Sequence, residues 1–227
     1  MPKLQWGAVG QRRFEAGVDR GVLYAPSYAG VPWNGLVNVV ETPVGGTPEP
    51  IYVDGVKIND VVSNEFYSAT IEAYSAPPEF KVCEGEKQIY PGVFAGQQVR
   101  QRFSFTYRTL IGNDTAGIKH GYKLHLVYNA TATSTEKTNA TMTNSVNPTM
   151  RKWTINAIPP QVSYDDIDFG PNARFTPSAH YVIDSTLVAS SSRLEEVEEI
   201  LYGSNSAAMI ARMPVIEEVL TILEYGA

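Results

Sequence analysis

The sequence predicts a mainly β fold with helices only near its C-terminal end, and three observations support this prediction. Apolar and polar residues alternate with a period of two through the middle of the chain, most clearly at Phe103, Phe105 and Tyr107. Apolar residues at helical spacing first appear beyond residue 190. Hydrophobic residues make up 43% of the 227 residues, so the chain can bury a core.

The predicted strands are short, apolar at alternate positions, and bounded by Gly, Pro, Asn or Asp. Between two of them, the residues at 111–120 include Gly112, Asn113, Asp114 and Gly117, which favours a hairpin with a ten-residue loop. The expected strands are 36–41, 56–63, 67–74, 103–109, 121–128, 150–158 and 179–184.

Three long polar or Pro/Gly-rich stretches separate these strands, at 42–50, 75–98 and 129–149. Loops of this length are uncommon in compact domains and are usually functional or disordered. We expect the first two to contact neighbouring subunits, because the second contains too many apolar residues for a free loop. The Thr-rich third stretch is β-prone and is expected to form a ribbon beside a partner strand. The predicted subunit-interface residues are Phe80, Val82, Tyr90, Phe94 and Trp33.

Two helices are predicted at the C-terminal end. Ser192 and Glu195 form a capping-box pattern at the start of the first, and Gly203 is its expected end. The second, from about 214 to 223, has an apolar surface too wide for a free tail, so it must dock on another surface. We divide the chain into a β domain, 1–203, and a C-terminal helical extension, 204–227.

Charge and cysteine content exclude several classes of protein. A net charge of -6 argues against wrapping nucleic acid, which requires clustered Lys and Arg. The single cysteine, Cys83, rules out an intrachain disulfide framework or a multi-cysteine metal site, and it indicates folding in a reducing cytoplasm. The sequence contains no apolar stretch long enough for a signal peptide or a membrane span, so we expect no membrane association.

The sequence contains no phosphate-binding glycine loop, metal-binding His pair or nucleophile elbow. His120, His125 and His180 show no ligand spacing, so we expect them to have surface or core roles. The acidic run at 165–168 has ligands that a hard cation would accept, but a solvated loop is the favoured interpretation. We therefore expect no enzymatic activity and no cofactor.

Four stretches carry a likeness to a known family. They are RRFEAGVDRGVLYAP with GVPWNGLVNVVETPVGGTPEPIYVDGVKI, then SATIEAYSAPPEFKVCEG, then FSFTYRTLIGNDTAGIKHGYKLHLVYNA, and finally YVIDSTLVASSSRLEEVEEILYG. In this order they resemble the major tail proteins of long, non-contractile-tailed bacteriophages. The likeness runs over most of residues 12–203, and it leaves the extension after Gly203 poorly covered.

The resemblance implies a tail-tube-type β-sandwich or half-barrel subunit with a packed α-helix. Such subunits form hexameric rings that stack into the tail tube of a virion and are made in the host cytoplasm. The tube is a conduit for DNA ejection and contacts the tape-measure, terminator and tail-tip proteins. About 24 strands, four from each of six subunits, spaced ~4.8 Å and tilted ~40°, give a backbone diameter of roughly 48 Å. Double-stranded DNA would pass without tight binding.

We expect the strands at 56–63, 67–74, 103–109 and 121–128 to line the tube, because their alternation gives one apolar face and one polar face. A conduit must not attract its cargo, so we also expect a net negative bore. The predicted lumen-facing residues are Asp60, Glu72, Ser104, Arg102 and Lys123.

Two other functions stay open. A tail-terminator or tail-tip ring protein of the same fold would form one closed ring, whereas a tube protein would form filaments. A receptor- or carbohydrate-binding β-sandwich is suggested by Trp6, Tyr28, Trp33 and Tyr90, although such aromatics are more often core or interface residues. Glycan binding by a monomer would favour this third function.

Overall fold

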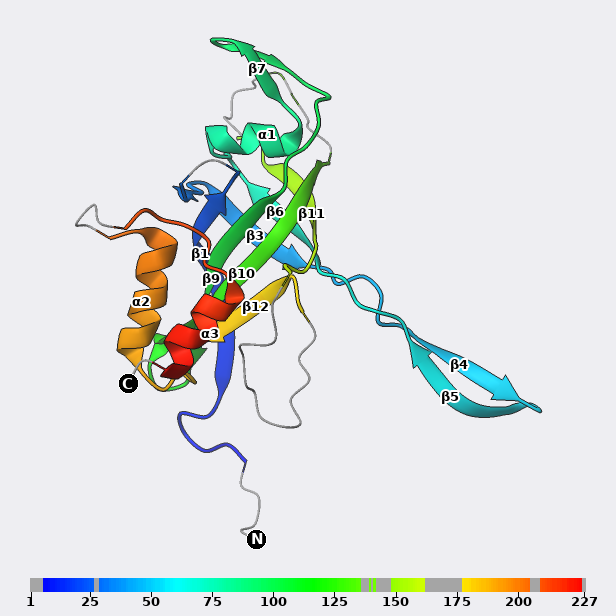
Figure 1. Cartoon of the computed structure of the whole chain (residues 1–227). Coiled ribbons are helices and arrows are strands. Elements are labelled where there is room, and N and C mark those ends of the chain that lie inside the picture. The colour runs from blue at the N-terminus through cyan, green and yellow to red at the C-terminus, as the bar shows by residue number, and fades with distance from the viewer. Residues whose placement is uncertain are drawn as a thin grey trace.

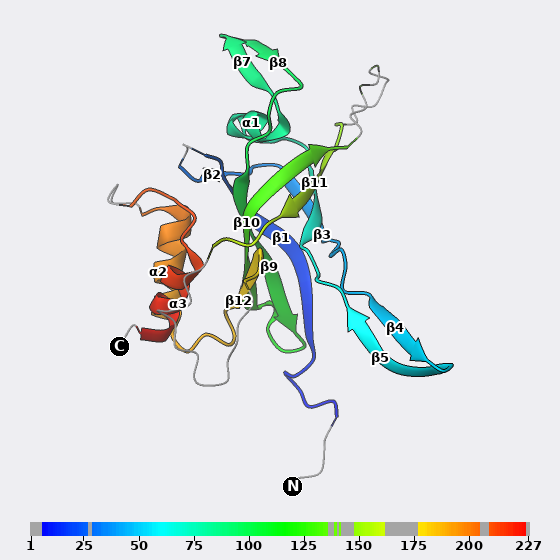
Figure 2. The same ribbon diagram turned by 45° about the vertical axis from the view of Figure 1, so that its right-hand side comes forward.

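The computed structural model describes residues 6–26, 29–135, 139, 141, 148–161, 177–204 and 209–225 (Figures 1 and 2). The described chain is mainly antiparallel β-structure with a few helices, so the predicted fold class is confirmed. The strands are β1 (Arg13–Tyr24), β2 (Val31–Pro32), β3 (Leu36–Glu41), β4 (Pro48–Val53), β5 (Val56–Val62), β6 (Ser68–Ala73), β7 (Lys87–Tyr90), β8 (Val93–Ala95), β9 (Phe103–Asn113), β10 (Gly117–Ser134), β11 (Arg151–Ala157) and β12 (His180–Asp184). The helices are η1 (Pro78–Phe80), α1 (Lys81–Glu84), α2 (Ser191–Tyr202) and α3 (Ile216–Tyr225).

An eight-stranded antiparallel sheet forms the body, in the order β2-β1-β9-β10-β11-β6-β3, with β12 also paired to β10. Strand β10 has 18 residues and belongs to both halves of the sheet: β12 pairs with its middle and β11 with its end. Its register against β9 shifts between Val127 and Ala130, where Asn129 has a φ of 48°. Such a bulge bends a strand, and the sheet curls around a core in a sandwich-like arrangement.

Aromatic residues fill the inside of this curled sheet. The ring of Trp33 lies 4.7 Å from that of Phe80, 5.4 Å from Phe105 and 5.7 Å from Trp153, measured between centroids. Phe80 comes from η1, which with α1 covers one end of the core, and Cys83 of α1 is also buried there. The alternation predicted for 103–109 is confirmed, because Phe105 and its alternate neighbours in β9 all belong to this core.

Gly21 shows how closely the two sides of the curled sheet approach each other. A Cβ atom at this position would lie 2.7 Å from Cδ2 of Leu36 and 3.3 Å from Cβ of Trp33. The Gly21 carbonyl also accepts a 2.7 Å hydrogen bond from the Trp33 amide. A side chain at residue 21 would therefore push the segment before β3 away from β1.

We predict that Gly21→Val lowers the free energy of unfolding by about 1–3 kcal/mol, the usual cost of overpacking a core. Gly96→Val is the matched control, because a Cβ at Gly96 meets no atom within 4 Å. Urea denaturation of both variants measures the difference. Equal urea midpoints for the two variants would contradict the close approach of Leu36 and Trp33 to Gly21.

Helices α2 and α3 cover the opposite face of β1, β10 and β12, where they build a second apolar cluster. Hydroxyl groups fasten this layer: Tyr24 donates to the Leu201 carbonyl at 2.8 Å, and Tyr128 donates to the Pro214 carbonyl at 3.1 Å. The C-terminal helix was predicted to pack on another surface. That surface is the sheet of its own chain, because Ile216 and Val219 of α3 are buried in the second apolar cluster. Within the described residues, no helix combines the length and apolar character needed to cross a bilayer.

Several sequence-based expectations are wrong in detail. The stretch at 42–50 is not all loop, because β4 begins at Pro48, and 75–98 contains η1, α1, β7 and β8. The ten-residue hairpin loop is much shorter, because β9 extends to Asn113 and β10 begins at Gly117. Helix α2 begins at Ser191, with Ser190 as its N-cap and without a side-chain capping bond, so the capping box is absent. Gly203 ends α2 as predicted.

The strand expected at 56–63 forms, as β5, but it does not join the body. It pairs with β4 in a separate hairpin that projects far from the sheet (Figure 1). Asp54 and Gly55 occupy its turn with φ values of 49° and 77°, which is the positive-φ pair that a tight hairpin turn requires. We call residues 45–64 the arm. Its stem is held by backbone hydrogen bonds between Val44 and Phe66.

Candidate assembly surfaces

The arm exposes apolar side chains along its whole length. Every residue of β4 and β5 is exposed. The register shifts between Ile51 and Tyr52, so Ile58 is an extra residue in β5. The cross-strand pairs then place Ile51, Val53, Val56 and Val61 on one face of the arm and Val62 on the other, with Val53 directly opposite Val56. Ile58 is 61% exposed and Val56 is 65% exposed. An isolated two-stranded hairpin is marginal in water, so this surface fits a role in contacts with another protein molecule.

A second hairpin, β7–β8, projects from the opposite end of the body (Figure 2). It carries two of the predicted interface residues, Tyr90 and Phe94, which are exposed. Three other predictions are wrong: Trp33 and Phe80 are core residues, and Val82 packs against that core. Helices η1 and α1 fold Phe80 and Val82 onto the sheet of the same subunit, and the segment between β2 and β3 buries Trp33 there, so these residues are not available to a neighbour.

The body presents two strands with a free side. Among the described residues, β3 forms a ladder only with β6, and the first half of β1, Arg13–Asp19, forms one only with β9. Unpaired strand edges can be extended by a strand from another chain. Both edges are therefore candidate sites for subunit pairing.

A polar sheet face lies on the outside of β3, β6 and β11. Since Ala69, Ile71 and Ala73 point into the core, the alternate residues of β6 point outward. Glu72 on this face forms an ion pair with Lys152, which lowers the pKa of the Glu72 carboxyl. The negative charge of Glu72 on this face is therefore compensated by the positive charge of Lys152. The outward residues of the three strands are Asn38, Val40, Thr70, Glu72, Lys152, Thr154 and Asn156.

The structure separates the predicted lumen-facing residues. Only Glu72 lies on the polar face of β3, β6 and β11. Asp60 is in the arm, where it pairs with Lys57 at 2.8 Å, and Arg102 is exposed just before β9. Ser104 and Lys123 lie on opposite faces of the β9–β10 sheet, so they cannot line one surface together.

The strands predicted to line the tube are also not one sheet. Strand β5 belongs to the arm, and β6 is separated from β9 by β10 and β11. The predicted water-facing side of 121–128 is wrong as well, because the residues from Leu124 to Tyr128 are all buried. Helices α2 and α3 cover one face of this strand, and the aromatic core covers the other.

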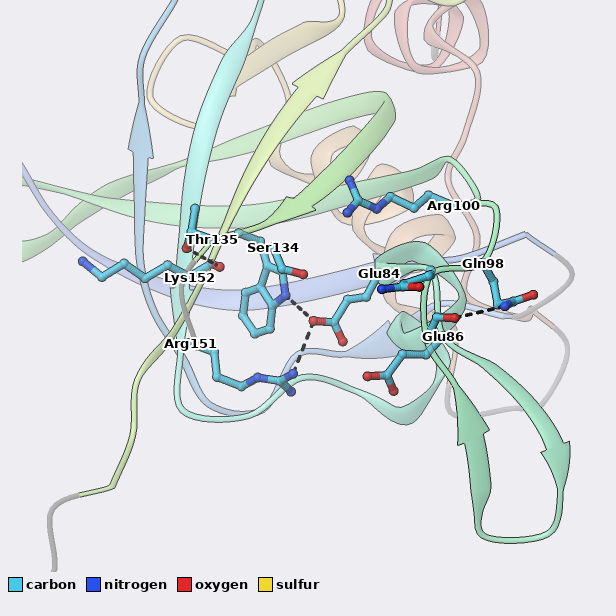
Figure 3. Close-up of a pocket in the computed structure, with 12 residues that line it drawn as sticks. Glu84, Glu86, Gln98, Arg100, Ser134, Thr135, Arg151 and Lys152 are labelled. Atoms are coloured by element: carbon cyan, nitrogen blue, oxygen red, sulfur yellow. Dashed lines mark hydrogen bonds and ion pairs between the residues drawn. The ribbon is translucent and has the colours of Figure 1, made fainter. Parts of the chain in front are cut away.

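A pocket of about 670 Å³ lies between the base of the β7–β8 hairpin, the end of β10 and the start of β11 (Figure 3). Its wall includes Trp153, whose indole N–H donates to Glu84 at 2.5 Å, and Arg151 donates to the same carboxylate at 3.3 Å. Arg100 and Glu86 also line it. Glu84 is thus paired with two donors, and the pocket is a polar recess.

Glu41, His125 and His180 form a polar cluster between β3, β10 and β12. One donor atom from each lies within 4.8 Å of the others. His125 Nδ1 is 3.1 Å from His180 Nε2 and 3.5 Å from Glu41 Oε1. The hydroxyl of Tyr107 donates to Glu41 at 2.5 Å, and Thr109 Oγ1 is 3.0 Å from His125 Nε2. Two histidines that show no ligand spacing in the sequence are thus neighbours in the fold, and His125 is buried as a core role would require.

Burial and hydrogen bonding set the charge state of this cluster. The contact with His125 and the hydrogen bond from Tyr107 outweigh burial and lower the pKa of Glu41 to about 2. Burial lowers the pKa of His180 to about 4. At neutral pH the cluster therefore holds a carboxylate beside a neutral His180 ring. No local sequence pattern relates the three residues, because only the curled sheet brings β3 to β10 and β12.

Some predicted features lie outside the described residues. These are the acidic run at 165–168, Tyr28, and most of the Thr-rich stretch after Thr135. No protein-family model matches the chain, and a comparison with curated proteins found no match either. The function is therefore inferred from the residues and their arrangement.

Proposed function

We propose that the chain is a structural, non-enzymatic subunit that assembles with copies of itself into a tube, as the tail-tube protein of a long-tailed bacteriophage does. In this proposal six subunits form each ring, and the rings stack into a virion conduit through which double-stranded DNA passes. Tape-measure, terminator and tail-tip proteins would contact the tube. The observation that carries the proposal is the arm, which exposes apolar residues on a hairpin that projects from a folded body.

The arm suits contact between copies of one chain. Large apolar side chains are exposed on both of its strands, and Tyr52, Val56 and Ile58 are each more than 60% exposed. Exposed apolar residues gathered on one projecting element are typical of a protein–protein contact. The arm is also held by only a narrow stem, so it can reach across the body of an adjacent subunit.

The free sides of β1 and β3 supply a route to ring closure. If the edge of one subunit adds to the edge of the next, a closed ring leaves no unpaired edge. The polar face of β3, β6 and β11 would then line the bore. Its Thr and Asn side chains and the Glu72–Lys152 pair give DNA phosphates no cluster of free cations to bind.

Electron microscopy of the purified full-length chain tests the proposal. We expect hollow filaments of uniform diameter, with six-fold symmetry in end-on views. Incubation with duplex DNA at low salt is expected to leave the DNA free in a co-sedimentation assay. Single closed rings would indicate a terminator or tail-tip protein, and a persistent monomer that binds glycans would indicate a receptor-binding module. Either result would overturn the tube proposal.

A further inference from the structure

We propose that Glu41, His125 and His180 form a binding site for one Zn²⁺ ion that fastens β3, at the root of the arm, to β10 and β12. This site goes beyond tube formation, because it belongs to the single subunit. The two imidazoles and one carboxylate are ligands that Zn²⁺ accepts. Two of the three side chains are well shielded from solvent, since the exposed fractions are 8% for His125 and 13% for His180.

The spacing of the donor atoms matches the size of the ion. The three atoms form a triangle with sides of 3.1, 3.5 and 3.8 Å. A triangle with these sides has a circumradius of about 2.0 Å, which is the usual Zn–N and Zn–O bond length. One ion at the centre of this triangle therefore lies within bonding distance of all three atoms. The two imidazole rings are nearly parallel, with centroids 5.3 Å apart and their nitrogens facing each other, so a small turn of the rings aims both nitrogens at the ion. A small shift of the ion out of the donor plane gives the pyramidal base of a tetrahedral site.

The hydrogen-bond pattern also fits ligation. Without a metal ion, two ring nitrogens only 3.1 Å apart require a proton between them. When a metal ion takes this position, the proton moves to the outer nitrogen of the same ring, and both imidazoles bind in their neutral form. When Nδ1 of His125 binds the ion, its Nε2–H can donate to Thr109 Oγ1 at 3.0 Å. Such an outer hydrogen bond orients most metal-binding histidines.

Solvent reaches the site from one side. Glu41 and His180 line a pocket of about 540 Å³, which also includes Pro43, Asn64 and Phe66 from the stem of the arm. An ion can enter from this pocket, and water can occupy its fourth coordination position. Glu41 is the last residue of β3, directly before the chain leaves for the arm. Bound Zn²⁺ would therefore hold this exit point against the sheet that carries β10 and β12.

Titration of the full-length, chelator-treated protein with Zn²⁺ tests the site. We expect one ion per chain by calorimetry, and a visible absorption band typical of tetrahedral coordination when Co²⁺ replaces Zn²⁺. Glu41→Gln and His180→Ala are each expected to weaken binding at least tenfold, because each removes one of three ligands. Zn²⁺ should raise the thermal midpoint of the unsubstituted chain but not that of His180→Ala.

His120→Ala is the matched control. It removes a histidine whose ring lies against Asn113, away from the cluster, and it should leave binding unchanged. Failure to bind one ion per chain at micromolar concentration would overturn the proposal. Undiminished binding by the Glu41→Gln/His180→Ala double variant, or loss of binding in His120→Ala, would overturn it too. Ion binding is counted per chain, so this outcome is independent of whether the protein forms tubes.

Discussion

Replacement of residues 46–63 by Asn-Gly is expected to abolish tube formation and leave a folded, soluble subunit. The replacement removes β4 and β5 but keeps the stem at Val44 and Phe66. Gly45 and Asn64 face each other closely, since a Cβ on Gly45 would lie 2.3 Å from the Asn64 carbonyl oxygen. A two-residue Asn-Gly turn can join such positions. Circular dichroism measures folding, and electron microscopy with light scattering measures assembly.

A substitution in the intact arm gives the sharper comparison. Val56→Asp places a charge on the apolar face of the arm, beside Val53, whereas Val62→Asp places the same charge on the opposite face. Because the arm contributes nothing to the core, neither variant should change the thermal midpoint of the subunit. We expect Val56→Asp to block assembly and Val62→Asp to permit it. Normal tubes from Val56→Asp would show that this face is not a subunit contact.

Phe105→Asp is expected to prevent folding. Phe105 is fully buried and packs against Trp33 and Tyr107. Loss of a buried Phe ring costs about 3–5 kcal/mol, and burial of a carboxylate without a partner costs several more. The sum is comparable to the whole stability of a typical domain, about 5–15 kcal/mol. Soluble yield, circular dichroism and proteolysis measure the loss.

Ser104→Asp is the control for this substitution. Ser104 precedes Phe105 in β9, points to the opposite face and is only half-buried. The carboxylate introduced at this half-buried position can reach water, so the expected loss of stability is below about 1 kcal/mol. If both substitutions were equally tolerated, the assignment of Phe105 to the core face of β9 and of Ser104 to the opposite face would be wrong.

The strands of the body were predictable where one face is apolar and the period of two is unbroken, as in β9. Strand β1 was missed because its register against β9 shifts twice, between Ala16 and Val18 and between Asp19 and Val22. These bulges, together with Gly17 and Gly21, interrupt the alternation. The Asp54–Gly55 turn was a readable hairpin signal, but the prolines of β4 concealed its partner strand.

The functional surfaces were less predictable, because they depend on what covers each residue. Apolar residues in a long connection look alike in the sequence, whether they meet their own core, as Phe80 does, or solvent, as Tyr90 does. Phe80 is buried and Tyr90 is exposed because η1 and α1 pack on the sheet, whereas the β7–β8 hairpin projects from it. The Glu41–His125–His180 cluster joins residues from distant strands, so no spacing rule could have found it.

The position of the arm has a consequence for how such a protein can diverge. Its apolar residues touch solvent rather than the aromatic core, so most changes in β4 and β5 leave the stability of the subunit nearly untouched. Selection can then act on these residues through the preference of one chain for copies of itself. Two related proteins made in the same cell could keep the same body and still assemble separately, if their arms had drifted apart.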